Sequence, residues 1–145
     1  MTATKLARSL VACLAMLALA AGVTACGGSS SDEKSAVQSR VKTIFSGFAN
    51  KDSGKICDSL SNKYKDRITK RPLGRAGKQS CEKVMTLVLS IGGKQLSQVD
   101  ETKVTSVKVD GDNATADVVY KGGKKGKVAL TKEGGGWRVS NFNFR

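Results

Sequence analysis

The residues of this chain best suited to covalent chemistry are its four cysteines, Cys13, Cys26, Cys57 and Cys81. A cysteine thiol can carry an acyl group, form a disulfide or bind a metal ion. The chain contains no histidine and no Cys-x-x-Cys motif, so Cys57 and Cys81 make a poor metal site. We expect no metal and no cofactor, and the absence of histidine also excludes Ser-His and Cys-His catalysis.

The residues before Cys26 predict export. A basic start precedes an apolar run over residues 10–21, which is too short to span a bilayer and has the layout of a secretory signal. The motif Val23-Thr24-Ala25-Cys26 resembles the lipobox of bacterial lipoproteins, although leucine is more usual at position 23. In such proteins the chain is cut before the cysteine, whose thiol then carries diacylglycerol.

This resemblance implies a signal peptide over residues 1–25 and a lipidated Cys26 at the start of a flexible Gly/Ser tether, residues 26–32. The expected location is the extracytoplasmic face of the cell membrane, held by the lipid anchor. The alternative is an ordinary secretory signal with a stray cysteine. In either case Cys57 and Cys81 meet an oxidising compartment, and we expect a disulfide that closes a loop of about 25 residues.

The charge of the chain bears on its partners. Loss of the signal leaves 23 of the 25 basic residues against 12 acidic ones, a net charge of +11. Two basic clusters are candidates for contact with an anionic lipid or wall polymer. The alternatives are plain solvation and, for the lysines of the hairpin, protection against edge pairing. The clusters comprise Lys63, Lys65, Arg67, Lys70, Arg71, Arg75 and Lys78, and Lys121, Lys124, Lys125 and Lys127. Aromatic residues are few and no nucleic-acid motif is present, so nucleic acid is not an expected partner.

Catalytic candidates are weak. A general base must lie near apolar walls to have a useful pKa, and Asp58 is the least implausible one, with a solvated helix-surface carboxylate as the alternative. Asp117 falls on the outward phase of its predicted strand. Tyr64 and Tyr120 could donate a hydrogen bond to a cavity, although buried tyrosines are commonly satisfied by backbone. We expect no catalytic residue.

The first half of the mature chain predicts helices. Val37, Val41, Ile44, Phe45 and Phe48 recur at helical spacing in a segment that runs from Asp32-Glu33 to about Asn50. Asp52 is placed to cap a short second helix, residues 62–70 continue as a third, and Ser80 is placed to cap a helix over 81–91 that ends at Gly92-Gly93. Residues 71–77 predict a loop.

The second half changes to a period of two. Val107 and Val109 lead into the turn Asp110-Gly111-Asp112-Asn113, and a strand with Ala114, Ala116, Val118 and Tyr120 on its apolar face returns. A turn over 122–126 precedes a strand over 127–132, and a turn over 133–136 precedes a strand that Trp137 anchors in the core. The layout is α+β, with a meander after the helices. Residues 96–102 are polar and predict no clear strand.

Three stretches carry a family resemblance: KDSGKICDSLS at 51–61, VKVDGDNATA at 107–116 and LTKEGGGWRV at 130–139. With Phe45 and Phe48 before them, they resemble exported members of the nuclear transport factor 2-like superfamily, over residues 33–145. The resemblance implies a cone in which a curved antiparallel sheet wraps a long helix and leaves a pocket. In that superfamily the pocket serves as an enzyme site, a ligand site or a dimer surface.

The function expected from these features is a membrane-anchored, non-catalytic binding or accessory module. Its partner is a small apolar ligand in the cone or a protein on the open sheet, a second copy included. One alternative is a small cell-surface enzyme of the isomerase or hydratase kind. The other is an electrostatic adaptor to anionic lipid or wall polymer.

Overall fold

The computed structural model describes residues 30–70, 79–92, 99 and 101–144. Within these residues the helices come first: α1 (Ser30–Ala49), α2 (Ser53–Ser59), α3 (Asn62–Thr69) and α4 (Cys81–Ile91). The strands follow: β1 (Lys103–Asp110), β2 (Asn113–Val119), β3 (Lys125–Glu133) and β4 (Gly136–Phe144). The predicted α+β class, with N-terminal helices packed on a curved antiparallel sheet, is confirmed.

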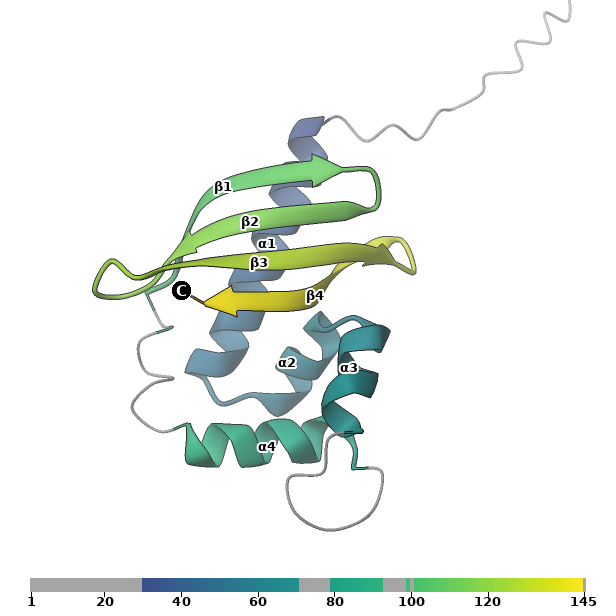
Figure 1. The fold of residues 1–145 in the computed structure, drawn as a ribbon, viewed down its shortest axis with the longest axis vertical. Helices are drawn as coiled ribbons and strands as arrows, with labels where there is room; N and C mark the ends of the chain where they lie inside the picture. The colour runs from purple at the N-terminus through teal and green to yellow at the C-terminus, as the bar shows by residue number, and fades with distance from the viewer. Residues whose placement is uncertain (1–29, 71–78, 93–98, 100, 145) are drawn as a thin grey trace, which may run out of the picture.

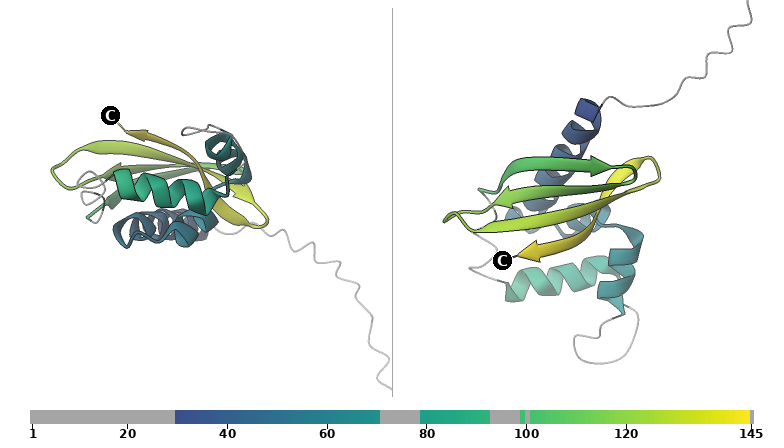
Figure 2. Two further views of the ribbon diagram at one scale, coloured as in Figure 1. Left: turned by 90° about the horizontal axis from the view of Figure 1, so that it is seen from below. Right: turned by 45° about the horizontal axis from the view of Figure 1, so that its top comes forward.

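The described strands form one antiparallel sheet in the order β1-β2-β3-β4. Irregular pairing between Val104 and Ser106 and between Ala129 and Leu130 bends the strands, because an extra residue on one strand increases the local twist. Helix α1 crosses one face of this sheet (Figure 1). Figure 2 shows α1 and α4 on that side of the sheet, whereas α3 lies beside the β4 edge.

Capping side chains begin three of the helices. Asp52, Ser61 and Ser80 each accept a hydrogen bond from the backbone N–H three residues later, which satisfies one of the free donors of a first helical turn. The caps predicted at Asp52 and Ser80 are confirmed. Helix α1 begins at Ser30, so residues 30–32 of the expected tether are helical.

The core lies between α1 and the sheet. Val37, Val41 and Ile44 of α1 are completely buried, as the helical spacing predicts. The inner face of the sheet faces them with side chains that are all at most 9% exposed: Ala114, Ala116, Val118, Tyr120, Val128, Leu130, Trp137 and Val139. The expected core position of Trp137 is therefore confirmed. These side chains and those of α1 belong to one apolar cluster of buried residues.

The expected disulfide is also present. Cys57 of α2 is bonded to Cys81 at the start of α4, with 6.0 Å between their Cα atoms. The segment after α2 covers the outer edge of the sheet, because Leu60 pairs with Val139 of β4 and the Ser61 N–H donates to the Val139 carbonyl at 2.9 Å. The disulfide and this pairing together hold the smaller helices at one end of the sheet.

Some expected boundaries differ from the structure. The turn predicted over 122–126 is shorter, since β3 already begins at Lys125 and Gly126 pairs with Val118. A Cβ at Gly126 would lie 2.8 Å from the ring of Tyr120, so the absence of a side chain lets this ring lie across β3. The predicted loop at 71–77 and most of the polar stretch 96–102 lie outside the described residues.

Candidate functional site

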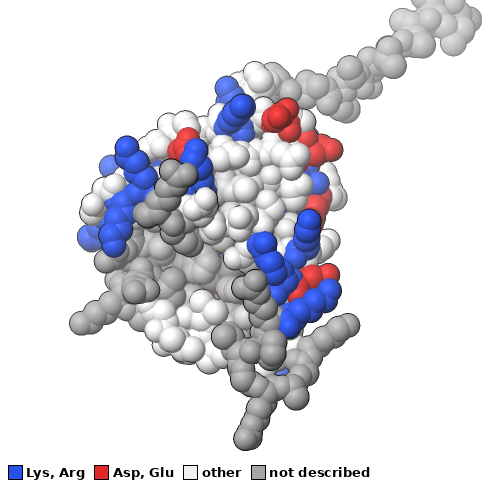
Figure 3. Space-filling model, viewed as in Figure 1, with Lys and Arg blue, Asp and Glu red and all other residues white. Residues whose placement is uncertain are grey.

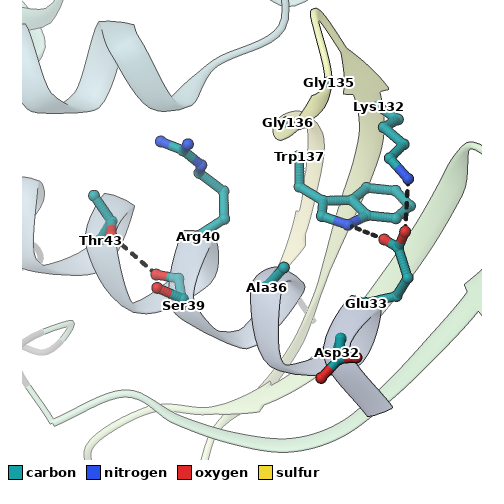
Figure 4. Close-up of a pocket in the computed structure, with 10 residues that line it drawn as sticks. All are labelled: Asp32, Glu33, Ala36, Ser39, Arg40, Thr43, Lys132, Gly135, Gly136 and Trp137. Atoms are coloured by element: carbon teal, nitrogen blue, oxygen red, sulfur yellow. Dashed lines mark hydrogen bonds and ion pairs between the residues drawn. The ribbon is translucent and has the colours of Figure 1, made fainter. Parts of the chain in front are cut away.

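A groove of about 480 Å³ lies beside α1, against the turn that joins β3 to β4 (Figure 4). Helix α1 and the β3–β4 hairpin supply all of its lining: Asp32, Glu33, Ala36, Ser39, Arg40, Thr43, Lys132, Gly135, Gly136 and Trp137. Gly134 and Gly135 form the turn with φ angles of 59° and 78°, a region that glycine adopts without steric cost. This tight turn sets Lys132 and Trp137 side by side at the groove.

Glu33 closes one end of the groove. Its Oε1 accepts a hydrogen bond from Lys132 Nζ at 2.6 Å, and its Oε2 accepts one from Trp137 Nε1 at 2.7 Å. The Lys132 ammonium also lies 5.6 Å from the centre of the indole ring. The Lys132 hydrogen bond, with help from Trp137, holds the pKa of Glu33 below its ordinary value, and the bond to Glu33 raises the pKa of Lys132.

Arg40 occupies the end of the groove away from Glu33 (Figure 4). Its side chain is half-buried, and it makes no ion pair with any described residue. Burial lowers the pKa of Arg40 and the nearby charge of Arg138 lowers it further, while Asp58 acts in the opposite direction. Arg138 donates a hydrogen bond from Nη1 to the backbone carbonyl of Asp58 at 2.7 Å. This hydrogen bond involves the main chain of Asp58 and not its carboxylate.

The described carboxyl groups with a shifted pKa are Glu33, Glu101 and Asp117, and all three shift downward. The main cause is a hydrogen bond in each case, from Lys132, Lys121 and Ser106 respectively. A general base for neutral pH needs a pKa raised toward 7 by apolar surroundings. These groups are therefore suited to structural ion pairs rather than to proton abstraction.

The catalytic candidates weighed from the sequence do not converge. Asp58 is exposed on α2, and Asp117 faces the outer side of the sheet as expected, where Ser106 and Lys127 contact it at 2.6 and 3.0 Å. Tyr120 is buried against Phe45, and burial raises its pKa to about 12. Tyr64 packs edge-on to Phe142, which in turn contacts Phe45, and Arg67 stacks on the Tyr64 ring.

The two basic clusters lie at different places. Figure 3 shows the Lys and Arg side chains of this face in separate groups, one over the end where β2 turns into β3 and one on the α3 side. In the first group Lys121 bonds Glu101 at 2.9 Å and Lys127 bonds Asp117 at 3.0 Å.

In the second group Arg67 stacks on Tyr64, 4.6 Å from its ring centre, and donates to the Ser140 carbonyl. Lys63, Lys65 and Lys70 belong to the same region, α3 and its C-terminal cap. Arg71, Arg75 and Lys78 lie outside the described residues. Whether the exposed members contact an anionic surface stays a prediction.

Two further features concern metals and membranes. In the described ranges, His, Cys, Asp and Glu side chains nowhere form a group of three that could hold a metal ion. None of the helices α1 to α4 has the length and apolar character needed to cross a bilayer.

Similarity of this chain to known proteins is found among solved structures and not among families or curated proteins. No protein-family model matches, and no curated protein matches. Among solved structures, an NTF-2 like protein of unknown function from Silicibacter pomeroyi aligns with 81% of this chain and 98% of its own, at 17% identity and a TM-score of 0.49.

Sequence reasoning did not find the groove. Glu33 was expected only as a favourable charge at a helix start, and Trp137 only as a core anchor. Glu33 does lie in the first turn of α1, and Trp137 is buried in the core. The hydrogen bond between these two side chains joins positions 104 residues apart, so no local sequence pattern could indicate it. Arg40 and Arg138 belong to no sequence motif either. They are distinguished by the closeness of their two positive charges in space, which the sequence does not show.

Proposed function

We propose that the protein is a lipoprotein anchored at the extracytoplasmic face of the cell membrane, with a single domain that acts as a non-catalytic binding module. The observation that carries the anchoring is the motif Val23-Thr24-Ala25-Cys26 directly after the apolar run. The Cys57–Cys81 disulfide supports export, since disulfides persist in oxidising compartments.

The proposed binding role rests on the position of the groove and of the charged side chains that line it. The described buried residues form one apolar cluster without a charged side chain, and the shifted carboxyl groups are poor bases at neutral pH. The groove beside α1, in contrast, is open and lined by polar and charged groups, with a volume in the usual range of ligand sites. We therefore place the binding site in this groove.

Anchoring is tested by substituting the cysteines before the domain. Cys26→Ala should release the protein into the medium and abolish labelling by a palmitate analogue, because the thiol that carries the lipid is lost. Cys13→Ala is the matched control, since this cysteine lies within the signal and should leave retention unchanged. Membrane retention and labelling of the Cys26→Ala chain would show that the anchoring proposal is wrong.

A further inference from the structure

The groove leaves one charge available to a ligand. At its acidic end both oxygens of Glu33 already accept hydrogen bonds, one from Lys132 and one from Trp137. At the other end the half-buried Arg40 has no ion-pair partner among the described residues. Asp32, the other carboxylate of the lining, has an interaction partner as well, so the charged group of the groove without an ion-pair partner among the described residues is the Arg40 guanidinium.

The surroundings of Arg40 increase its attraction for an anion. Arg138 lies close enough for its charge to act on Arg40, and Asp58 is the one described carboxylate with an opposing effect. The positive charges of Arg40 and Arg138 are thus opposed by the negative charge of Asp58. Because Asp58 is exposed, solvent screens its attraction for Arg40. A bound anion would remove the repulsion between the two arginines in a partly desolvated place, where electrostatic interactions are stronger than in water.

The donors at this end match an oxyanion. A guanidinium presents its N–H groups in a planar fork that fits phosphate or carboxylate in a two-bonded arrangement. Ser39 and Thr43 line the groove on either side of Arg40 in the sequence, and Thr43 Oγ1 donates to the Ser39 carbonyl. The exposed Ser39 adds a hydroxyl that can donate to a ligand oxygen.

The position of the groove favours phosphate, and this step rests on the proposed anchor. Helix α1 begins four residues after Cys26, and four residues span at most about 14 Å. Arg40 lies ten residues further along the helix, a rise of about 15 Å. Arg40 therefore lies at most about 29 Å along the chain from the lipidated cysteine, a distance that allows the groove to contact phospholipid head groups.

We propose that this groove binds a phosphate group, with Arg40 as the direct ligand and Arg138 as a supporting charge. The source is a phospholipid head group or a soluble phosphate compound. Trp137 lines the groove and is the only tryptophan of the chain, so its fluorescence reports binding there.

The test is a titration of the full-length chain, purified in a neutral detergent, with inorganic phosphate at constant ionic strength. A saturable change in Trp137 fluorescence that chloride does not reproduce is expected. Arg40→Gln should weaken binding at least about tenfold, because it removes charge-assisted hydrogen bonds. Asp58→Asn should tighten binding, since it removes the competing carboxylate. Lys42→Gln is the control for net charge, as Lys42 is exposed on the same helix outside the groove.

The result that overturns the proposal is a wild-type titration without saturation, or one that Arg40→Gln leaves unchanged. A parallel titration with monomeric short-chain phosphatidylglycerol separates the sources. Tighter binding of this lipid than of inorganic phosphate identifies a head group, whereas equal or weaker binding identifies a soluble phosphate. The titration does not depend on acylation, so a failure of the Cys26→Ala test and a failure of the groove are distinguishable.

Discussion

The carboxylate of Glu33 accepts a hydrogen bond of 2.7 Å from the indole N–H of Trp137, across 104 positions of the chain. Glu33 stands in the first turn of α1 and Trp137 at the start of β4, so this bond ties the first described helix to the last strand. Lys132 of β3 holds the other oxygen of the same carboxylate. One acidic side chain thus connects the N-terminus of α1 to both strands of the C-terminal hairpin.

The protein should lose stability in acid partly through Glu33. Its pKa is lowered in the folded state from an ordinary value of 4.5, so the unfolded chain takes up the proton first as the pH falls. The stabilising contribution is complete above about pH 4.5 and is lost as the pH falls through the lower folded pKa. Thermal unfolding across this range should show a melting temperature that decreases below this pH.

Glu33→Gln is the variant that checks this prediction. The amide has no charge to titrate, so the decrease in melting temperature should be smaller than in the wild type. A residual decrease is expected because the pKa values of Glu101 and Asp117 are also lowered. Curves for wild type and Glu33→Gln that stay parallel from neutral pH downward would contradict the assignment.

Gly126→Ala should destabilise the sheet. The new Cβ would lie 2.8 Å from the Cε2 atom and 2.8 Å from the hydroxyl oxygen of Tyr120, and this buried ring is fixed between β3 and Phe45. Overpacking of this kind costs about 1–3 kcal/mol, measurable by urea unfolding. Gly136→Ala is the matched control, because a Cβ there meets no atom within 4 Å.

A double-mutant cycle separates the clash from a general effect of alanine in β3. Tyr120→Leu removes the ring, so Gly126→Ala should cost much less in that background than in the wild type. If the cost of Gly126→Ala is the same in both backgrounds, contact with Tyr120 is not its cause.

Removal of the disulfide should lower stability by about 3 kcal/mol, since the bond closes a loop of 24 positions and restricts the unfolded chain. The double variant Cys57→Ala and Cys81→Ala, compared with the wild type in urea, measures this difference. A reductant should destabilise the wild type to a similar extent and leave the double variant unchanged. Equal stability of wild type with and without reductant would argue that the bond does not form in solution.

Local patterns in the sequence were enough to predict the elements of this fold. The helical spacing of Val37, Val41 and Ile44 and the alternation through Ala114, Ala116 and Val118 match the buried faces, because burial selects apolar residues with the period of the backbone. Capping at Asp52 and Ser80 acts over three residues and is equally visible. The pair Cys57 and Cys81 was predicted from the count of cysteines and the expected export.

Tertiary structure alone decided where the groove and its free charge lie. Glu33 forms its hydrogen bonds to Lys132 and Trp137 only when α1 is packed across the β3–β4 hairpin. The same packing brings Arg40 close enough to Arg138 for their charges to interact. Electrostatic interactions depend on distance in space and on burial, and neither is encoded by a short stretch of chain. The sequence by itself therefore determined the helices and strands of this protein and predicts its location, whereas the packing of α1 on the sheet determined the site.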